Sequence, residues 1–198
     1  EAALNQMLAA GQAAADFNFG QADQNFSQAG QNFLNAQNQL SEINGLILAL
    51  AALAPDKNLQ LAAAAQNILK AGQLSASAGQ NLSLAVDSIF NNEVKDINAI
   101  LPNLNLYGHQ AINDLNNLTK ELEQIDSHAI PENYQANFAL LKQKVGELNR
   151  GLNEFIGLAD SLRDFLGLSA NQRYLLVFQN NSELRASGGF IGSFALID

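Results

Sequence analysis

The sequence predicts a mainly α-helical fold: a long antiparallel four-helix bundle with coiled-coil-like seams, followed by the first two strands of an incomplete α/β or α+β domain. Three observations predict it. Apolar residues recur at alternating spacings of four and three over four stretches of similar length. Pro and Asn residues lie in the short segments that connect these stretches. After Gly167 the spacing stops, and two short runs rich in branched and aromatic residues follow.

Residues 1–18 form the expected lead helix, because the stretch from Ala2 to Phe17 is rich in alanine and other strong helix formers. Its expected seam, the line of residues that faces a neighbouring helix, is Leu4, Leu8, Gly11 and Ala15. We expect Asn18, Phe19 and Gly20 to separate this helix from the next. One continuous long helix is the alternative.

Residues 19–168 form the expected bundle of four helices, each about 35 residues and roughly 50 Å long. The first seam is Ala22, Phe26, Ala29, Phe33, Ala36, Leu40, Ile43, Ile47 and Leu50. The second is Leu61, Ala64, Ile68, Ala71, Ser75, Ala78, Leu82, Ala85 and Ile89. The third is Ile97, Leu101, Leu104, Gly108, Ala111, Leu115, Leu118, Leu122 and Ile125. The fourth is Tyr134, Phe138, Leu141, Val145, Leu148, Leu152, Phe155, Ala159, Leu162 and Leu166.

Helix-breaking residues set the expected boundaries. Pro55 with Asp56 predicts the start of the second bundle helix, Asn91 with Asn92 its end, and Pro131 the first turn of the last. Pro102 falls inside the third seam, and we expect it to split that helix near residues 101–103.

The side chains along the seams predict how the helices pack. Alternating alanines in the first two seams predict a tightly apposed pair of helices, because small side chains let helix axes approach closely. The phenylalanines at seam positions, Phe26, Phe33, Phe138 and Phe155, are interpreted as core residues.

Residues 169–198 form the expected second, truncated sheet domain. Arg173–Gln179 and Phe190–Ile197 predict strands that are apolar on both faces, as in a covered sheet, and two strands alone are marginal in water. We therefore expect the rest of the sheet to come from the remainder of its own polypeptide, or from other copies that pair with the strand edges 175–178 and 190–196.

Composition and charge exclude several classes of function. The net charge is −9 and no Lys or Arg precedes Lys57, so a nucleic-acid partner is not expected. The apolar run of residues 46–54 is too short to cross a bilayer, so no direct membrane insertion is expected. With no Cys and only two His, the sequence indicates no metal site, no cofactor and no catalytic residues, which argues against an enzyme.

The stretch RYLLVFQNNSELRASGGFIGSFALI, residues 173–197, resembles the signature of the bacterial domain-of-unknown-function family 4012. In that family a long Ala-rich helical region comes first. It is followed by a strand, a Gln-Asn turn, a Glu-Leu-Arg triplet and a Gly-Gly-Phe-Ile-Gly strand. Members usually stand behind one N-terminal membrane helix. The resemblance therefore implies an extracellular location at the bacterial cell surface, with a membrane anchor before residue 1, and this chain starts at Glu1 without Met.

A fainter similarity extends to the LytR-CpsA-Psr phosphotransferases, which hold a polyprenyl pyrophosphate with arginines. It implies a phosphate clamp at Arg185, near Glu183, although no Arg-x-Asp-Thr follows. Asn180, Gly188 and Gly189 complete the set of candidate ligand-binding residues. The structural alternative is an ion pair between Glu183 and Arg185 and a tight strand entry at the glycines.

Two functions follow as hypotheses. The first is an extracellular structural or interaction module, a helical stalk or spacer that presents a sheet domain and contacts copies of itself. The second is an accessory region of an envelope glycopolymer transferase.

Overall fold

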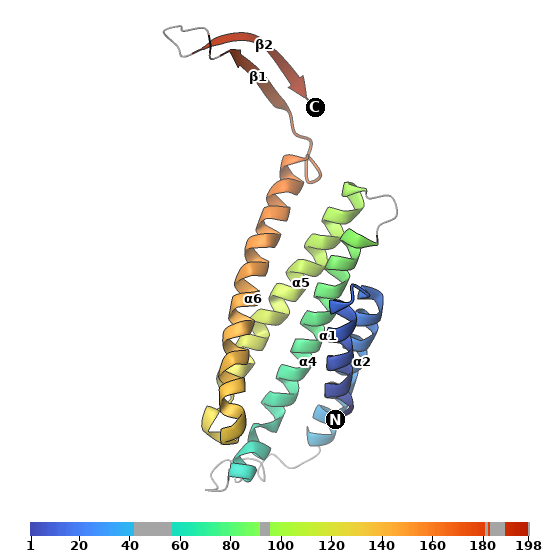
Figure 1. The fold of residues 1–198 in the computed structure, drawn as a ribbon, viewed down its shortest axis with the longest axis vertical. Coiled ribbons are helices and arrows are strands. Elements are labelled where there is room, and N and C mark those ends of the chain that lie inside the picture. Colours follow the sequence, from blue (N-terminus) through green and yellow to red (C-terminus); the bar gives the residue numbers. More distant parts are fainter. Residues whose placement is uncertain (42–56, 92–95, 181, 183–188, 198) are drawn as a thin grey trace. The chain divides into compact units, whose positions relative to one another are not determined.

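A computed structural model describes residues 1–41, 57–91, 96–180, 182 and 189–197 (Figure 1). Its fold is mainly helical with two antiparallel strands at the C-terminal end, which confirms the predicted fold class. The elements are α1 (Ala2–Ala15), α2 (Phe19–Ser41), α4 (Lys57–Phe90), α5 (Ile97–Gln124), the 3-10 turn η1 (Ser127–Ala129), α6 (Glu132–Phe165), β1 (Tyr174–Asn180) and β2 (Phe190–Ile197). The chain packs as two units, residues 1–157 and 158–198, and the boundary between them in the sequence falls within α6.

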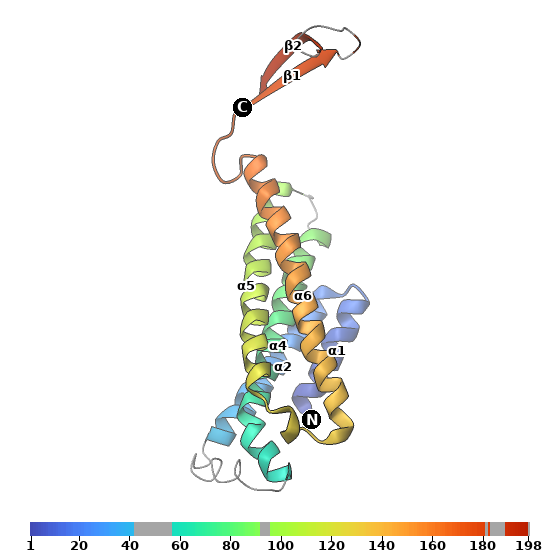
Figure 2. The same ribbon diagram turned by 90° about the vertical axis from the view of Figure 1, so that its left-hand side faces the viewer.

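In the first unit, close contacts link α1 to α2, α2 to α4, and α4 to α5, so these helices are neighbours in chain order (Figure 1 and Figure 2). The ranges expected from sequence, 1–18, 19–168 and 169–198, stay a prediction, as does a closed four-helix bundle. Pro55, Asp56, Asn92 and the last three positions of the first seam lie outside the described residues.

Residues 16–18 separate α1 from α2, which confirms a break after the lead helix, but Phe19 and Gly20, expected in the break, are the first residues of α2. The N–H of Asn18 donates to the carbonyl of Ala13 (2.8 Å), and the N–H of Phe17 donates to that of Ala14 (3.1 Å). This pattern ends a helix through a residue in the left-handed region, and Phe17 has a φ of 58°. The ring of Phe17 lies edge-on to those of Phe19 and Phe90, with ring centroids 6.1 Å apart in each case.

The seam predicted for α1 is wrong. Leu4 and Leu8 are 60% and 74% exposed, whereas Ala10, which is not on the predicted line, is fully buried. In an Ala-rich helix several faces are equally apolar, so α1 docks on α2 through its smallest side chains and leaves the larger leucines outside.

The α2–α4 pair is as closely packed as the alternating alanines predict. Ala22, Ala29 and Phe33 of α2 are buried, as are Ala71, Ala78 and Ala85 of α4. Two phenylalanine rings fill the space where glycines lack a side chain. A Cβ added to Gly72 would lie 2.5 Å from the Phe33 ring, and one added to Gly79 would lie 2.5 Å from the Phe26 ring. The predicted core roles of Phe26 and Phe33 are therefore confirmed.

The α4–α5 pair combines an apolar seam with polar contacts. Most of the predicted third seam is buried, from Leu101 to Ile125, while Ile97 remains 44% exposed. Beside it, Lys70 pairs with the buried carboxylate of Glu121. Ser77 and Asn81 both donate to Asp114, at 2.6 and 2.9 Å. Each of these contacts forms in one alignment of the two helices only, so together they specify the register of α4 against α5.

The predicted split at Pro102 is wrong, because α5 runs unbroken from Ile97 to Gln124. Only one helical turn precedes Pro102. Asp96 holds that turn by accepting from the backbone N–H of Asn98, and the burial of Leu101 anchors it. A proline this close to a capped N-terminus removes few helical hydrogen bonds.

The predicted seam of α6 consists of two rows of residues, each with a spacing of seven. The structure confirms one row and shows that the other was wrong. Val145 and Ala159 are buried and Phe138 and Leu152 partly buried, as expected, whereas Leu166, the last member of this row, is 42% exposed. The companion row Tyr134, Leu141, Leu148, Phe155 and Leu162 is 40–57% exposed. Its place is taken by the row one residue later, Lys142, Asn149, Ile156 and Arg163.

Two contacts with α5 explain this rotation of α6. Ile156 is fully buried because it fills the space above Gly108, and Asn149 donates to Asn116 (2.8 Å). The predicted core role of Phe155, which is 48% exposed, is therefore wrong.

Candidate functional site

The C-terminal strands form one antiparallel hairpin. Tyr174 pairs with Ile197, and the register continues to Phe178 with Ser193. It shifts by one residue between Phe178 and Gln179, as a β-bulge does. The predicted strands 173–179 and 190–197 agree with β1 and β2, and the structure adds that they pair with each other.

One face of this hairpin is apolar and open to solvent. Residues that pair directly across two antiparallel strands point to the same face. Leu175 pairs with Leu196, and Val177 with Phe194. Their exposed fractions are 61%, 61%, 47% and 69%. We call these four residues the Leu175 face.

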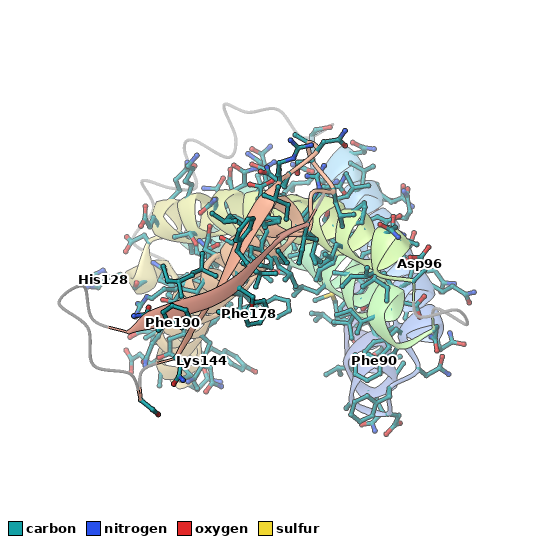
Figure 3. All side chains as sticks on the ribbon, turned by 90° about the horizontal axis from the view of Figure 1, so that it is seen from above. Phe90, Asp96, His128, Lys144, Phe178 and Phe190 are labelled. Carbon is teal, nitrogen blue, oxygen red and sulfur yellow. The ribbon has the colours of Figure 1, made fainter. Side chains whose placement is uncertain are left out.

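The opposite face, which we call the Tyr174 face, is also apolar. It carries Tyr174, Leu176, Phe178, Ala195 and Ile197, with one polar residue, Ser193, opposite Phe178. Leu176, Phe178 and Ile197 are 41–56% exposed, and Figure 3 shows the side chains of Phe178 and Phe190 on the hairpin. An isolated two-stranded sheet with two uncovered apolar faces is marginally stable, so both faces have the character of surfaces that another element covers.

An open hollow of about 1100 Å³ lies at the base of the hairpin, within residues 158–198. The ring of Tyr174 lies 5.0 Å from that of Phe165, and its hydroxyl donates to the carbonyl of Phe165. The lining combines apolar side chains with polar groups of the connecting loop; it consists of Phe165, Leu166, Gly167, Asn171, Gln172, Arg173, Tyr174, Leu175, Leu176 and Ile197.

Two of the five predicted ligand-binding residues lie in the described part of the hairpin. The side-chain oxygen of Asn180 accepts from the backbone N–H of Ser182 at 3.0 Å, which is a turn-forming contact. A Cβ added to Gly189 would lie 2.7 Å from the carbonyl oxygen of Asn180. Gly189 is therefore required by the close approach of β1, which supports the tight strand entry. Glu183, Arg185 and Gly188 lie outside the described residues.

The described residues offer little for catalysis. They hold no group of three or more His, Cys, Asp or Glu that could bind a metal ion. The clearly shifted carboxyl groups belong to the first unit: a hydrogen bond from the backbone N–H of His128 lowers the pKa of Asp126, and one from the Lys144 side chain lowers that of Glu147. Both carboxylates are exposed and paired, which suits local structure better than proton transfer. Within the same described ranges, no helix is long and apolar enough to cross a membrane.

Sequence reasoning missed the hollow at the hairpin base. It depends on the path of residues 166–173, where Gly167 takes a positive φ of 72°, and on the return of Tyr174 to Phe165. The available signal was the pair of aromatic residues that flank this loop.

Comparison with known proteins gives one finding. No curated protein and no solved structure matches the chain. The similarity to LytR-CpsA-Psr phosphotransferases therefore has no support here. Residues 170–198, which contain β1 and β2, match the model of a family described as protein of unknown function (DUF4012), in agreement with the resemblance seen in residues 173–197. The hairpin is thus the part of this chain that is identified as DUF4012 sequence.

Proposed function

We propose that this chain is a structural and interaction module of a bacterial cell-surface protein, in which the helices act as a stalk or spacer and the hairpin is the point of attachment. The observation that carries the proposal is the hairpin itself, whose Leu175 face and Tyr174 face are both apolar and open. Uncovered apolar surface of this kind is typical of contact sites with other protein elements.

The helices support the spacer part of the proposal. Both α4 and α6 have 34 residues, so each is about 51 Å long. Their described polar contacts, such as Lys70 with Glu121 and Asn149 with Asn116, join one helix to the next. Side chains used in this way fix geometry and are not arranged around a substrate.

The hairpin supports the interaction part. In the described residues β1 pairs with β2 alone, so the outer edge of each strand can accept a further strand. The covering element is the remainder of its own polypeptide or another copy that pairs at the edges 175–178 and 190–196. The extracellular location rests on the family resemblance, and release of the protein from intact cells by an added protease tests it.

The experiment replaces the directly paired residues Val177→Lys and Phe194→Glu together. Opposite charges keep a favourable cross-strand pair while they remove the apolar surface. The matched control is Leu8→Lys, which places a charge at a leucine of α1 that is 74% exposed.

We expect the unmodified chain to bind an apolar fluorescent dye and to scatter light increasingly with concentration. The double variant should lose the part of both signals that the hairpin contributes, and the control should keep them. Equal signals from all three proteins would contradict the proposal. Polyprenyl pyrophosphate binding that Arg185→Ala abolishes would favour the transferase hypothesis instead.

A further inference from the structure

Helix α6 carries more apolar surface than α5 covers. Tyr134, Leu141, Leu148 and Phe155 are 57%, 45%, 46% and 48% exposed, and we call these four residues the exposed stripe. The neighbouring line of α6, with Val145 at 7% and Ile156 at 0%, is the one that packs on α5. A helix with apolar residues on two adjacent lines is suited to two neighbours.

The spacing of the exposed stripe indicates that its second neighbour is a helix. Each member follows the previous one by seven residues. On a straight α-helix such a row drifts by about 20° per heptad, and it stays in contact with a partner only when two helices wind around each other. A sheet or a flat surface does not require this repeat.

The stripe also includes a gap in the side-chain surface. Gly151 lies three residues after Leu148 and four before Phe155, so it faces the same side of α6. A Cβ at Gly151 would have nothing within 4 Å. Glycine disfavours a helix interior, so a glycine there without a packing role works against α6 itself.

Three helical glycines of this chain receive a large side chain from the neighbouring helix, whereas others, such as Gly11 and Gly146, have open space around them. Phe33 fills the space at Gly72, and Ile156 fills that at Gly108. The exposed stripe holds both halves of such a contact, Phe155 as the projecting side chain and Gly151 as the gap. A surface that contains both complementary parts can pair with an identical surface across a two-fold axis.

We infer that the exposed stripe is an interface between two copies of this chain, in which α6 helices run antiparallel and Phe155 of each copy packs on Gly151 of the other. Both contacts form together only in the antiparallel arrangement, with the axis near residue 153. This axis places Tyr134 opposite position 172, beyond the end of α6 at Phe165, so the interface uses the stripe from Leu141 to Phe155. Lys144, labelled in Figure 3, lies on the stripe, three residues after Leu141 and four before Leu148. It pairs with Glu147 at 2.7 Å, so its charge is partnered and no block of like charge opposes association.

This inference does not depend on the hairpin. Three stripe side chains from each copy form a small patch compared with the ~800 Å² per partner of a standard interface, so association is weak and depends on concentration. Sedimentation equilibrium over a range of concentrations measures it.

The decisive variant is Gly151→Ala, and its matched control is Gly146→Ala. Gly146 also has open space around its missing Cβ, but it lies about 140° around the helix from Gly151. Both changes favour helix formation, and each should raise Tm by about 2–4 °C. Only Gly151→Ala should weaken dimerisation, by about tenfold or more, because it fills the gap that Phe155 occupies.

A monomer at every concentration would overturn the inference, and so would equal dimerisation of the two variants. If the two glycine variants dimerise equally and the double variant Val177→Lys with Phe194→Glu does not dimerise, the association belongs to the hairpin. The two proposals can therefore fail separately.

The absence of native cysteines permits a second test with single introduced thiols. Glu154→Cys lies one residue from the axis and should form a disulfide-linked dimer. Lys144→Cys should not, because its two copies would be about 27 Å apart along the antiparallel helices. A reversed result would show a parallel pair and overturn the arrangement.

Discussion

Replacing Gly108 by alanine tests how tightly α5 and α6 interlock. The new Cβ would lie 2.2 Å from Cδ1 and 2.7 Å from Cγ1 of Ile156. Carbon atoms in contact prefer about 3.5–4.0 Å, so Ile156 must move by more than ~1 Å. Because Ile156 is fully buried, it has little free space into which to move.

Two opposing effects set the size of the change. Alanine in place of a helical glycine stabilises the fold by about 1 kcal/mol. Overpacking of a filled site typically costs about 1–3 kcal/mol. We therefore expect Gly108→Ala to lower the free energy of unfolding by about 0–2 kcal/mol.

The control is Gly11→Ala in α1, where an added Cβ has nothing within 4 Å and only the gain in helix propensity applies. The difference between the two variants cancels that gain and isolates the overpacking, about 1–3 kcal/mol. Urea denaturation followed by helical circular dichroism measures both.

The double variant Gly108→Ala with Ile156→Val checks the cause. It removes the Cδ1 atom that clashes most, so part of the loss should be recovered as a favourable coupling energy of about 0.5 kcal/mol or more. If Gly108→Ala stabilised the chain as much as Gly11→Ala does, the close packing of α5 on α6 would be refuted.

Two further predictions concern charged groups. Lys70→Met should lower the free energy of unfolding by about 1–2 kcal/mol in denaturant titrations, because it leaves the buried carboxylate of Glu121 without its partner, an effect reduced by the partial exposure of Lys70. Adding Glu121→Leu should recover most of that loss; a double variant as unstable as the single one would contradict the reasoning. Asp126 should titrate below the ordinary aspartate pKa in an NMR titration, chiefly because the backbone N–H of His128 donates to it. The stability from this lowered pKa is present above the unfolded-state pKa and is lost as pH falls through the folded-state pKa. The variant His128→Ala should keep most of the pKa shift, because the backbone donor remains. A full return of Asp126 to the ordinary aspartate pKa in that variant would refute the backbone cause.

Periodicity identified helices and strands better than it identified which faces meet. The row of residues through Val145 and Ala159, spaced by seven, was predicted correctly. It borders both the predicted companion row and the observed one, so it lies in the contact with either. The companion row was not predicted correctly, because Leu141, Leu148 and Phe155 are more apolar than the true contact row, which includes Lys142 and Asn149. The stem of a lysine packs well while its charge stays in water, and the Lys142 amine lies 4.7 Å from the centre of the Phe138 ring. A hydropathy pattern cannot express this.

The candidate site shows the same limit. Apolar residues on both sides of the predicted strands indicated the two apolar faces of the hairpin, which were expected to be covered and are open. The need for glycine at position 189 could be suggested from sequence, but its cause, the close approach of the Asn180 carbonyl, depends on pairing between strands that are ten residues apart. The hollow beside Tyr174 depends on an irregular loop, for which no periodic signal exists.

Hydrogen exchange measured amide by amide on the dilute chain tests the division into a stable helical spacer and an uncovered hairpin most directly. The buried middle of α5, around Leu115 and Leu118, should exchange orders of magnitude more slowly than β1 and β2. Strand amides as strongly protected as those of α5 in the monomer would contradict it, because the hairpin would then need no partner.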